Sequence, residues 1–175
     1  MNPFLILEAR LAALLAAHVY FTGVPMITEE EQNLEAAIEA ELAKSGFCVV
    51  ITLARGDCGG DTTRDRALDD RLEFTVAISR NSTLETAKHT LHGLWAAIAA
   101  INGQVVDATL DRRGQEYFQI TSHDSGATAE APEGLYVQQL NVAVRKRLDV
   151  AGYQLPVATS GGTPQAPSSD PPQSA

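Results

Sequence analysis

Residues 47–54 read FCVVITLA, an unbroken apolar run rich in β-branched side chains. A run of this kind is typical of a β-strand that is covered on both faces. From Leu72 to Ser79, apolar and polar residues alternate instead, which predicts a second strand with one buried face. The two segments place a β-sheet at the centre of the expected fold.

Helical patterns flank this pair of strands. An alanine- and leucine-rich segment predicts a first helix over residues 2–20. Residues 28–45 and 82–101 each begin with the S/T-x-x-E pattern of a capping box, so two further helices are expected there. In the last of these helices, an apolar stripe is expected to face the core. The stripe comprises Leu84, Ala87, Leu91, Leu94, Trp95, Ile98 and Ile101.

The last third of the chain has strand patterns only. Residues 104–110 and 116–122 flank a glycine-containing turn, which predicts a hairpin, and residues 135–148 predict a long final strand. The order α-α-β-β-α-β-β-β predicts an α+β domain, a mostly antiparallel sheet with helices packed on one face. The side chains of the final strand that are expected to point inward are those of Tyr136, Leu140, Val142 and Val144.

Composition sets the expected domain organisation. A chain of 175 residues, 45% of them hydrophobic, predicts one α+β domain over residues 1–153, including the N-terminal helical extension. Residues 154–175 are rich in Pro, Ser and Gly, and they predict a tail that does not fold alone. No apolar run reaches the roughly 18 residues of a membrane span, and two cysteines fit a reducing compartment. A soluble intracellular protein is therefore expected.

Candidate chemical motifs are weak. His123, Asp124 and Ser125 are adjacent, whereas the side chains of a hydrolase triad must converge in space from separate positions. His89 and His92 are spaced for one helix face, but no acidic residue or cysteine lies within the next turn to complete a metal site. We therefore predict no catalytic residue, no cofactor and no metal, and hence no enzyme.

Charge is the most informative pattern. The formal net charge is -9, which disfavours a protein that coats duplex DNA. Carboxylates concentrate in the second predicted helix, and cations form small clusters at predicted strand ends. We expect the two sets to meet head to tail between subunits, a contact that can close into a ring. The expected interface residues are Glu31, Glu35 and Glu39 on the acidic side and Arg112, Arg113, Arg145, Lys146 and Arg147 on the basic side. Reversing the charges of Arg145 and Arg147 is expected to weaken oligomers.

From about Ile27 to Val150, this layout resembles the tail terminator (tail completion) proteins of long-tailed bacteriophages, such as the minor tail protein U of lambdoid phages. The resemblance rests on the order of elements, on the acidic helix before the run FCVVI (47–51), and on the closing strand LYVQQLNV (135–142). The N-terminal helix and the proline-rich tail depart from the small members of that family.

The resemblance implies a non-enzymatic structural protein of the virion. Such proteins assemble in the host cytoplasm into a ring, a hexamer in this family, at the head-proximal end of the tail. The ring ends the tail tube, joins it to the head connector or stopper protein, and lets DNA pass through its bore without sequence-specific binding. We expect a long loop over residues 55–70 to contact the tail tube protein beneath the ring. The loop residues expected to do so are Arg55, Asp57, Asp61, Arg64 and Arg66.

Three alternatives remain open from the residues. The chain could be another neck or tail-tube component of the same particle, or an adaptor whose proline-rich tail docks to a partner. It could also be a small ligand-binding or enzymatic α+β domain. That last alternative requires polar side chains facing inward, whereas the predicted inward faces are almost purely apolar.

Overall fold

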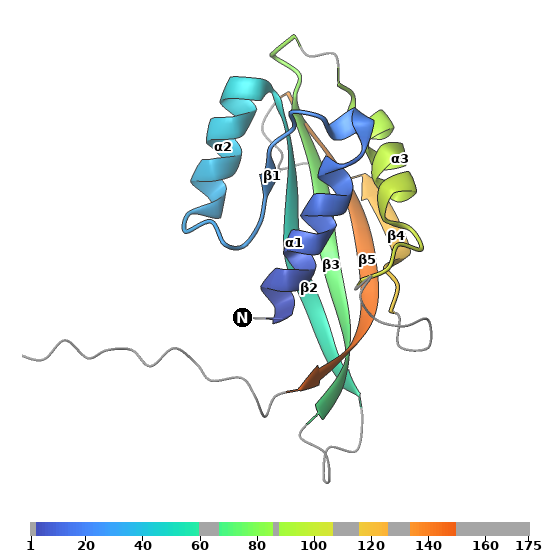
Figure 1. The fold of residues 1–175 in the computed structure, drawn as a ribbon. Coiled ribbons are helices and arrows are strands. Elements are labelled where there is room, and N and C mark those ends of the chain that lie inside the picture. Colours follow the sequence, from blue (N-terminus) through green and yellow to red (C-terminus); the bar gives the residue numbers. More distant parts are fainter. Residues whose placement is uncertain (1–2, 60–66, 86–87, 107–115, 126–133, 150–175) are drawn as a thin grey trace, which may run out of the picture.

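The structure is a computed structural model that describes residues 3–59, 67–85, 88–106, 116–125 and 134–149. These residues form a five-stranded sheet in the order β1-β2-β3-β5-β4 (Figure 1). β1 runs parallel to β2, and the other neighbouring pairs are antiparallel. The predicted α+β class and mostly antiparallel sheet are confirmed. The strands are β1 (Met26–Ile27), β2 (Phe47–Gly59), β3 (Ala67–Asn81), β4 (Gln119–Ser125) and β5 (Leu135–Asp149).

Helices cover both faces of this sheet within the described part of the chain. They are α1 (Pro3–Ala16), the 3-10 turn η1 (Val19–Phe21), α2 (Leu34–Ser45) and α3 (Thr90–Ile101). The order of helices and strands agrees in outline with the predicted order. It differs by the short strand β1 and by residues 104–106, which form one bridge through Val105 to Tyr117. Residues 107–115 of the predicted hairpin and the predicted tail over 154–175 lie outside the described residues.

The main core lies between one face of the sheet and the helices α1 and α3. Alternate residues of β3 and β5 point to this face, as their period-two patterns predict. Leucines of α1 and small residues of α3 pack against them. The residues of β3 and β5 that this layer buries completely are Leu72, Phe74, Val76, Ile78, Leu140 and Val142.

The helix α2 packs on the opposite face, so the expectation that all helices share one face is wrong for α2. Cys48 and Val50 point away from the main core and form a second cluster with Ile27 and Leu42. The unbroken apolar run of β2 is thus covered on both faces, as its sequence predicts. α2 packs on the opposite face because the apolar run of β2 offers apolar side chains to both sides of the sheet.

Helix α2 begins later than its capping box predicts. Asn33 caps it, with the Asn33 Oδ1 atom accepting from the Ala36 N–H at 3.1 Å. The Glu29 carboxylate, which belongs to the predicted first turn, instead accepts from the Leu53 N–H of β2 at 3.1 Å. A tertiary hydrogen bond therefore holds Glu29, which the sequence places in the first turn of the helix, on β2 instead.

Candidate assembly surfaces

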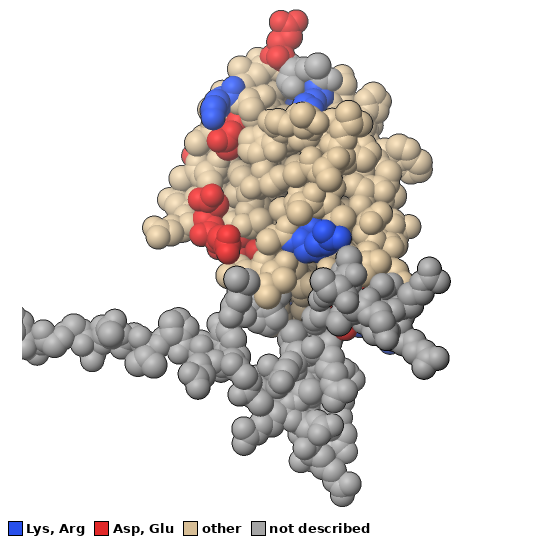
Figure 2. Space-filling model, viewed as in Figure 1, with Lys and Arg blue, Asp and Glu red and all other residues tan. Residues whose placement is uncertain are grey.

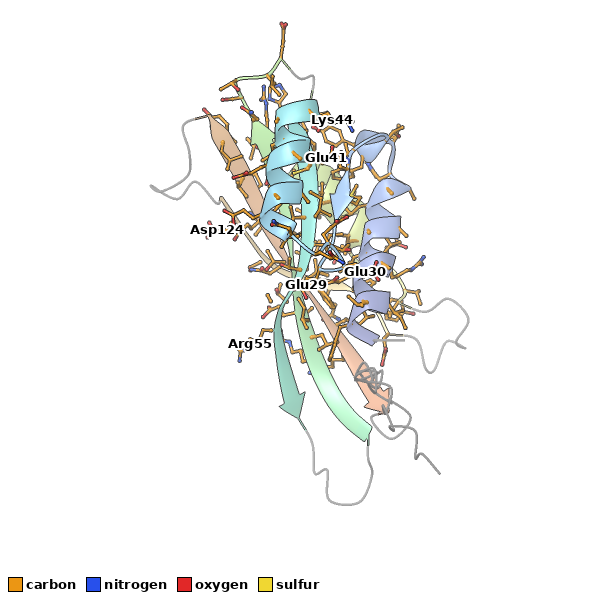
Figure 3. All side chains as sticks on the ribbon, turned by 90° about the vertical axis from the view of Figure 1, so that its left-hand side faces the viewer. Glu29, Glu30, Glu41, Lys44, Arg55 and Asp124 are labelled. Atoms are coloured by element: carbon orange, nitrogen blue, oxygen red, sulfur yellow. The ribbon has the colours of Figure 1, made fainter. Side chains whose placement is uncertain are left out.

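Four exposed carboxylates of α2 and of the turn before it form what we call the acidic surface: Glu30, Glu31, Glu35 and Glu39. Their side chains point to solvent because Leu34, Ala37 and Ile38 turn the apolar stripe of α2 towards the sheet. Figure 2 shows acidic side chains gathered on the α2 side of the molecule, and Figure 3 shows Glu29 and Glu30 in the turn below α2. Lys44 lies at the other end of the helix, 3.8 Å from Glu41. The predicted acidic residues are thus exposed side by side.

Two other acidic side chains of this region make hydrogen bonds within the fold. Glu8 of α1 is only 1% exposed, and its Oε2 atom accepts from the Glu29 N–H at 3.3 Å. Its Oε1 atom is buried and has no hydrogen-bond partner among the described residues. Burial raises the pKa of the Glu8 carboxyl, and the nearby Glu29 carboxylate raises it further. Glu8 and Glu29 together link α1, the turn before α2, and β2.

The structure describes some of the predicted basic interface residues and not others. Arg145 is exposed on β5 and pairs in register with Arg71 of β3. Lys146 and Arg147 belong to β5 at positions opposite Asp70 and Asp69, and Arg112 and Arg113 lie outside the described residues. A hollow of about 470 Å³ adjoins Arg145 and is lined by Arg71, Glu116, Tyr117, Gln119, Ala143, Val144 and Arg145. In the order of the sheet, β3 lies between β5 and β2.

The long loop predicted over residues 55–70 is wrong at both ends. Arg55 and Asp57 belong to β2, which pairs with β3 as far as Gly59 opposite Asp69. Asp61, Arg64 and Arg66 lie outside the described residues. Glycine and aspartate disfavour strands locally, but the antiparallel pairing resumes after a register shift between Leu53 and Arg55 and overrides that preference.

The surface that the sequence did not reveal is the outer side of α1 and α3. Leu91 is 66% exposed and Trp95 is 74% exposed, although both belong to the stripe expected in the core. No charged residue is among the exposed residues of these two helices, which are Ile6, Ala9, Ala13, Ala16, Leu91, His92, Trp95 and Ala99. We call this set the uncharged surface. The face towards the viewer in Figure 2 is largely tan, with a small basic area in its lower part.

Close packing explains why α3 turns Trp95 outwards. A Cβ atom built on Gly93 would lie 3.0 Å from Ile78 Cγ2 and 3.2 Å from Phe47 Cζ. The helix therefore approaches the sheet along its smallest residues, and Ala97 and Ala100 continue that side. The signal in the sequence was the spacing of Gly93, Ala97 and Ala100, which competes with the larger stripe one position away.

A polar network fixes the start of α3 beside the uncharged surface. The Tyr20 hydroxyl accepts from the His89 N–H and donates to the His89 carbonyl, both at 2.8 Å. Lys88 donates to the Tyr20 carbonyl at 2.5 Å, and Arg80 donates to His89 Nδ1 at 2.7 Å. Both predicted histidines are exposed. A hollow of about 390 Å³ lies here, lined by Arg80, His89, Thr90, Leu91, His92 and Tyr136.

The final strand agrees with its predicted pattern except at one position. Leu140, Val142 and Val144 are buried, whereas Tyr136 is 56% exposed and lines the hollow beside α3. Among the described residues, no group of three or more His, Cys, Asp and Glu side chains could hold a metal ion. In the same part of the chain, no helix has the length and apolar character needed to cross a membrane.

The fold of this chain is similar to that of a protein of known structure. The chain is similar to a chain of the virion of a native gene transfer agent particle, at 17% sequence identity and a TM-score of 0.47. The similarity covers 81% of this chain and 94% of that chain. No protein-family model matches, and no curated protein matches.

Proposed function

We propose that this protein is a structural subunit of a phage-type particle that assembles into a ring at the head-proximal end of a tail. In this role it terminates the tail tube and joins it to the head connector or stopper protein, and it catalyses no reaction. The proposal starts from the family resemblance of residues 27–150. The observation that carries it is the uncharged surface, where Leu91 and Trp95 are exposed on a well-packed helix.

Large exposed apolar side chains on a rigid helix are typical of surfaces that another protein covers. The distribution of charge over the rest of the surface is compatible with head-to-tail contacts between copies of this chain. The acidic surface lies on α2, at the other side of the molecule from α3 (Figure 1), so that a subunit offers different chemistry to its two neighbours. Heterologous contacts of this kind close into rings when the rotation between subunits permits.

Within the proposal, DNA passes through the bore of the ring, and a negative net charge of -9 limits its adhesion to the wall. The distal part of the β2–β3 hairpin reaches the tail tube protein beneath, with Arg55 and Asp57 on the strand and Asp61, Arg64 and Arg66 beyond it. A ring of six subunits, as in the resembled family, is the expected stoichiometry.

Native mass spectrometry and negative-stain microscopy of the purified protein test the proposal, alone and with polymerising tail tube protein. We expect closed rings and tubes that stop growing when the protein is added. A chain that stays monomeric at every concentration, and leaves tube length unchanged, would contradict the proposal.

A further inference from the structure

The inference concerns which surface of a neighbouring copy meets the acidic surface, and it rests on the proposed ring. α2 contacts β1, β2 and β3, whereas α3 contacts β3, β5, β4 and α1. The two helices therefore lie on different sides of the molecule, with α1 between them in Figure 1. A surface on α2 and a surface on α3 can join successive copies head to tail without blocking each other.

The receiving surface surrounds the start of α3. Its hollow of about 390 Å³ has Leu91 and Tyr136 in its lining, and both side chains are more than half exposed. Between Arg80 and Ile101 the chain carries two cations, Arg80 and Lys88, against one carboxylate, Glu85. This segment therefore carries a small excess of positive charge in a protein whose net charge is negative.

The inserting surface is the exposed side of α2. Between Glu29 and Lys44 the chain carries six carboxylates and one cation. Glu35 and Glu39 are exposed one turn apart, and the alanines next to each of them, Ala36 and Ala40, are exposed as well. Small side chains allow this helix to approach a neighbouring surface closely, and the carboxylates are placed beside the contact.

We propose that α2 of one copy docks on the α3 hollow of the next copy, with Ala36 and Ala40 against Leu91 and Trp95. In this contact Glu35 and Glu39 face the positive surroundings of Arg80 and Lys88. The exposed apolar side chains of α3 are covered by the same contact. The partner of the acidic helix is then the start of α3 and not the strand ends around Arg145.

Paired charge changes test the contact in the full-length protein. Glu35→Lys with Glu39→Lys reverses the acidic side, and Leu91→Glu with His92→Glu reverses the receiving side. All four positions are exposed, so we expect the variants to keep the monomer fold. We expect each double variant to weaken self-association at least about tenfold, measured by sedimentation. An equimolar mixture of the two should restore assembly, because each altered surface then meets a complementary one.

Trp95 gives an independent signal because it is the single tryptophan of the chain. We expect its fluorescence to shift to shorter wavelength and to resist quenching by iodide when wild-type protein assembles. Trp95→Ala should weaken association about thirtyfold. The matched control is Arg145→Glu on β5, which should leave association unchanged.

Two outcomes overturn the inference while the proposed ring survives. In the first, rings form but the paired variants have no effect and Arg145→Glu breaks them, so the strand ends are the partner. In the second, deletion of residues 154–175 exposes Trp95 in a monomer, so the chain's own tail covers α3. A wild-type protein that never assembles contradicts the proposed function itself.

Discussion

α2 and the layer of α1 and α3 cover opposite faces of the same sheet, and they differ in what they bury and in what they expose. The α1–α3 layer buries the larger core, and none of the exposed positions of its two helices carries a charged residue, although Arg10 of α1 is partly exposed. α2 buries a small cluster of Ile27, Leu42, Cys48 and Val50, and it exposes carboxylates. The comparison shows that a helix held by few apolar contacts can carry like charges outwards, whereas the helices of the main core leave apolar side chains uncovered.

Truncation of the two cores should show the largest difference in stability. Phe74→Ala empties the centre of the main core, where the side chain is 0% exposed, and we expect a loss of about 3–5 kcal/mol in the free energy of unfolding. Leu42→Ala acts on the small cluster at 8% exposure, and about 2 kcal/mol is expected. Guanidinium unfolding of both variants measures this. Equal losses would mean that α2 is as deeply anchored as α1 and α3.

The thiol of Cys48 reports on the same small cluster. Burial raises the pKa of Cys48 to about 11 from 9.0, and Glu41 adds to the effect. In a Cys58→Ser background, the thiolate fraction at pH 8 should therefore be about a hundredfold below that of an ordinary thiol. Labelling with Ellman's reagent should be slow in the native protein and fast after unfolding. Rapid native labelling would show that α2 opens readily.

Glu8→Gln tests the buried carboxyl that joins the two regions. The pKa of Glu8 is raised above its ordinary value of 4.5, so its protonated form is favoured in the folded state. The protonated Glu8 side chain therefore adds to the free energy of unfolding. This contribution is complete below about pH 4.5 and is lost as the pH rises through the raised pKa of Glu8. We expect the variant to be more stable than wild type at neutral pH, on the order of 1 kcal/mol, with the difference vanishing in acid.

Glu35→Gln is the matched control for this measurement, because Glu35 is exposed on α2. Its unfolding free energy at neutral pH should lie within about 0.5 kcal/mol of the wild-type value. A Glu8→Gln variant that is less stable at neutral pH would show that the ionised carboxylate, through its bond to the Glu29 N–H, stabilises the fold.

The smallest expected effect belongs to the uncharged surface. Trp95→Ala should change the unfolding free energy of the monomer by less than about 0.5 kcal/mol, because the side chain is 74% exposed. Leu94→Ala, one residue earlier and 8% exposed, should cost about 2 kcal/mol or more. Thermal unfolding at dilute protein concentration compares them. A large loss for Trp95→Ala would place it in the core of the monomer.

Much of the fold could be predicted because period-two patterns are local. The run FCVVITLA, the alternation from Leu72, and the final strand with Leu140 and Val142 all lie where the patterns predict. The start of α3 could not be predicted from its capping box. The Ser82 N–H donates to the Gly134 carbonyl at 2.7 Å, and the helix begins instead at Thr90 after the Tyr20–His89 hydrogen bonds. A capping pattern cannot show that a distant strand will compete for its groups.

Of the two candidate assembly surfaces, one could be predicted from the sequence and the other could not. The acidic surface follows from the sequence, because a helix with one apolar stripe must expose its carboxylates. The uncharged surface does not, because residues 90–101 have small and large apolar side chains on adjacent sides. The stripe of larger side chains, which includes Leu91 and Trp95, would be expected to face the core. In the structure, Gly93 and Ala97 face the sheet instead.

By itself, the amino-acid sequence determined the central sheet, the coverage of β2 on both faces, and the separation of charge along the chain. Those properties depend on side-chain periodicity, which neighbouring residues fix. Only the tertiary structure decided where α2 and α3 begin, on which face α2 lies, and that Trp95 and Leu91 point to solvent. The reason is that each of these depends on contacts between distant segments, such as Gly93 against Ile78 and Phe47, where the available space selects the helix face.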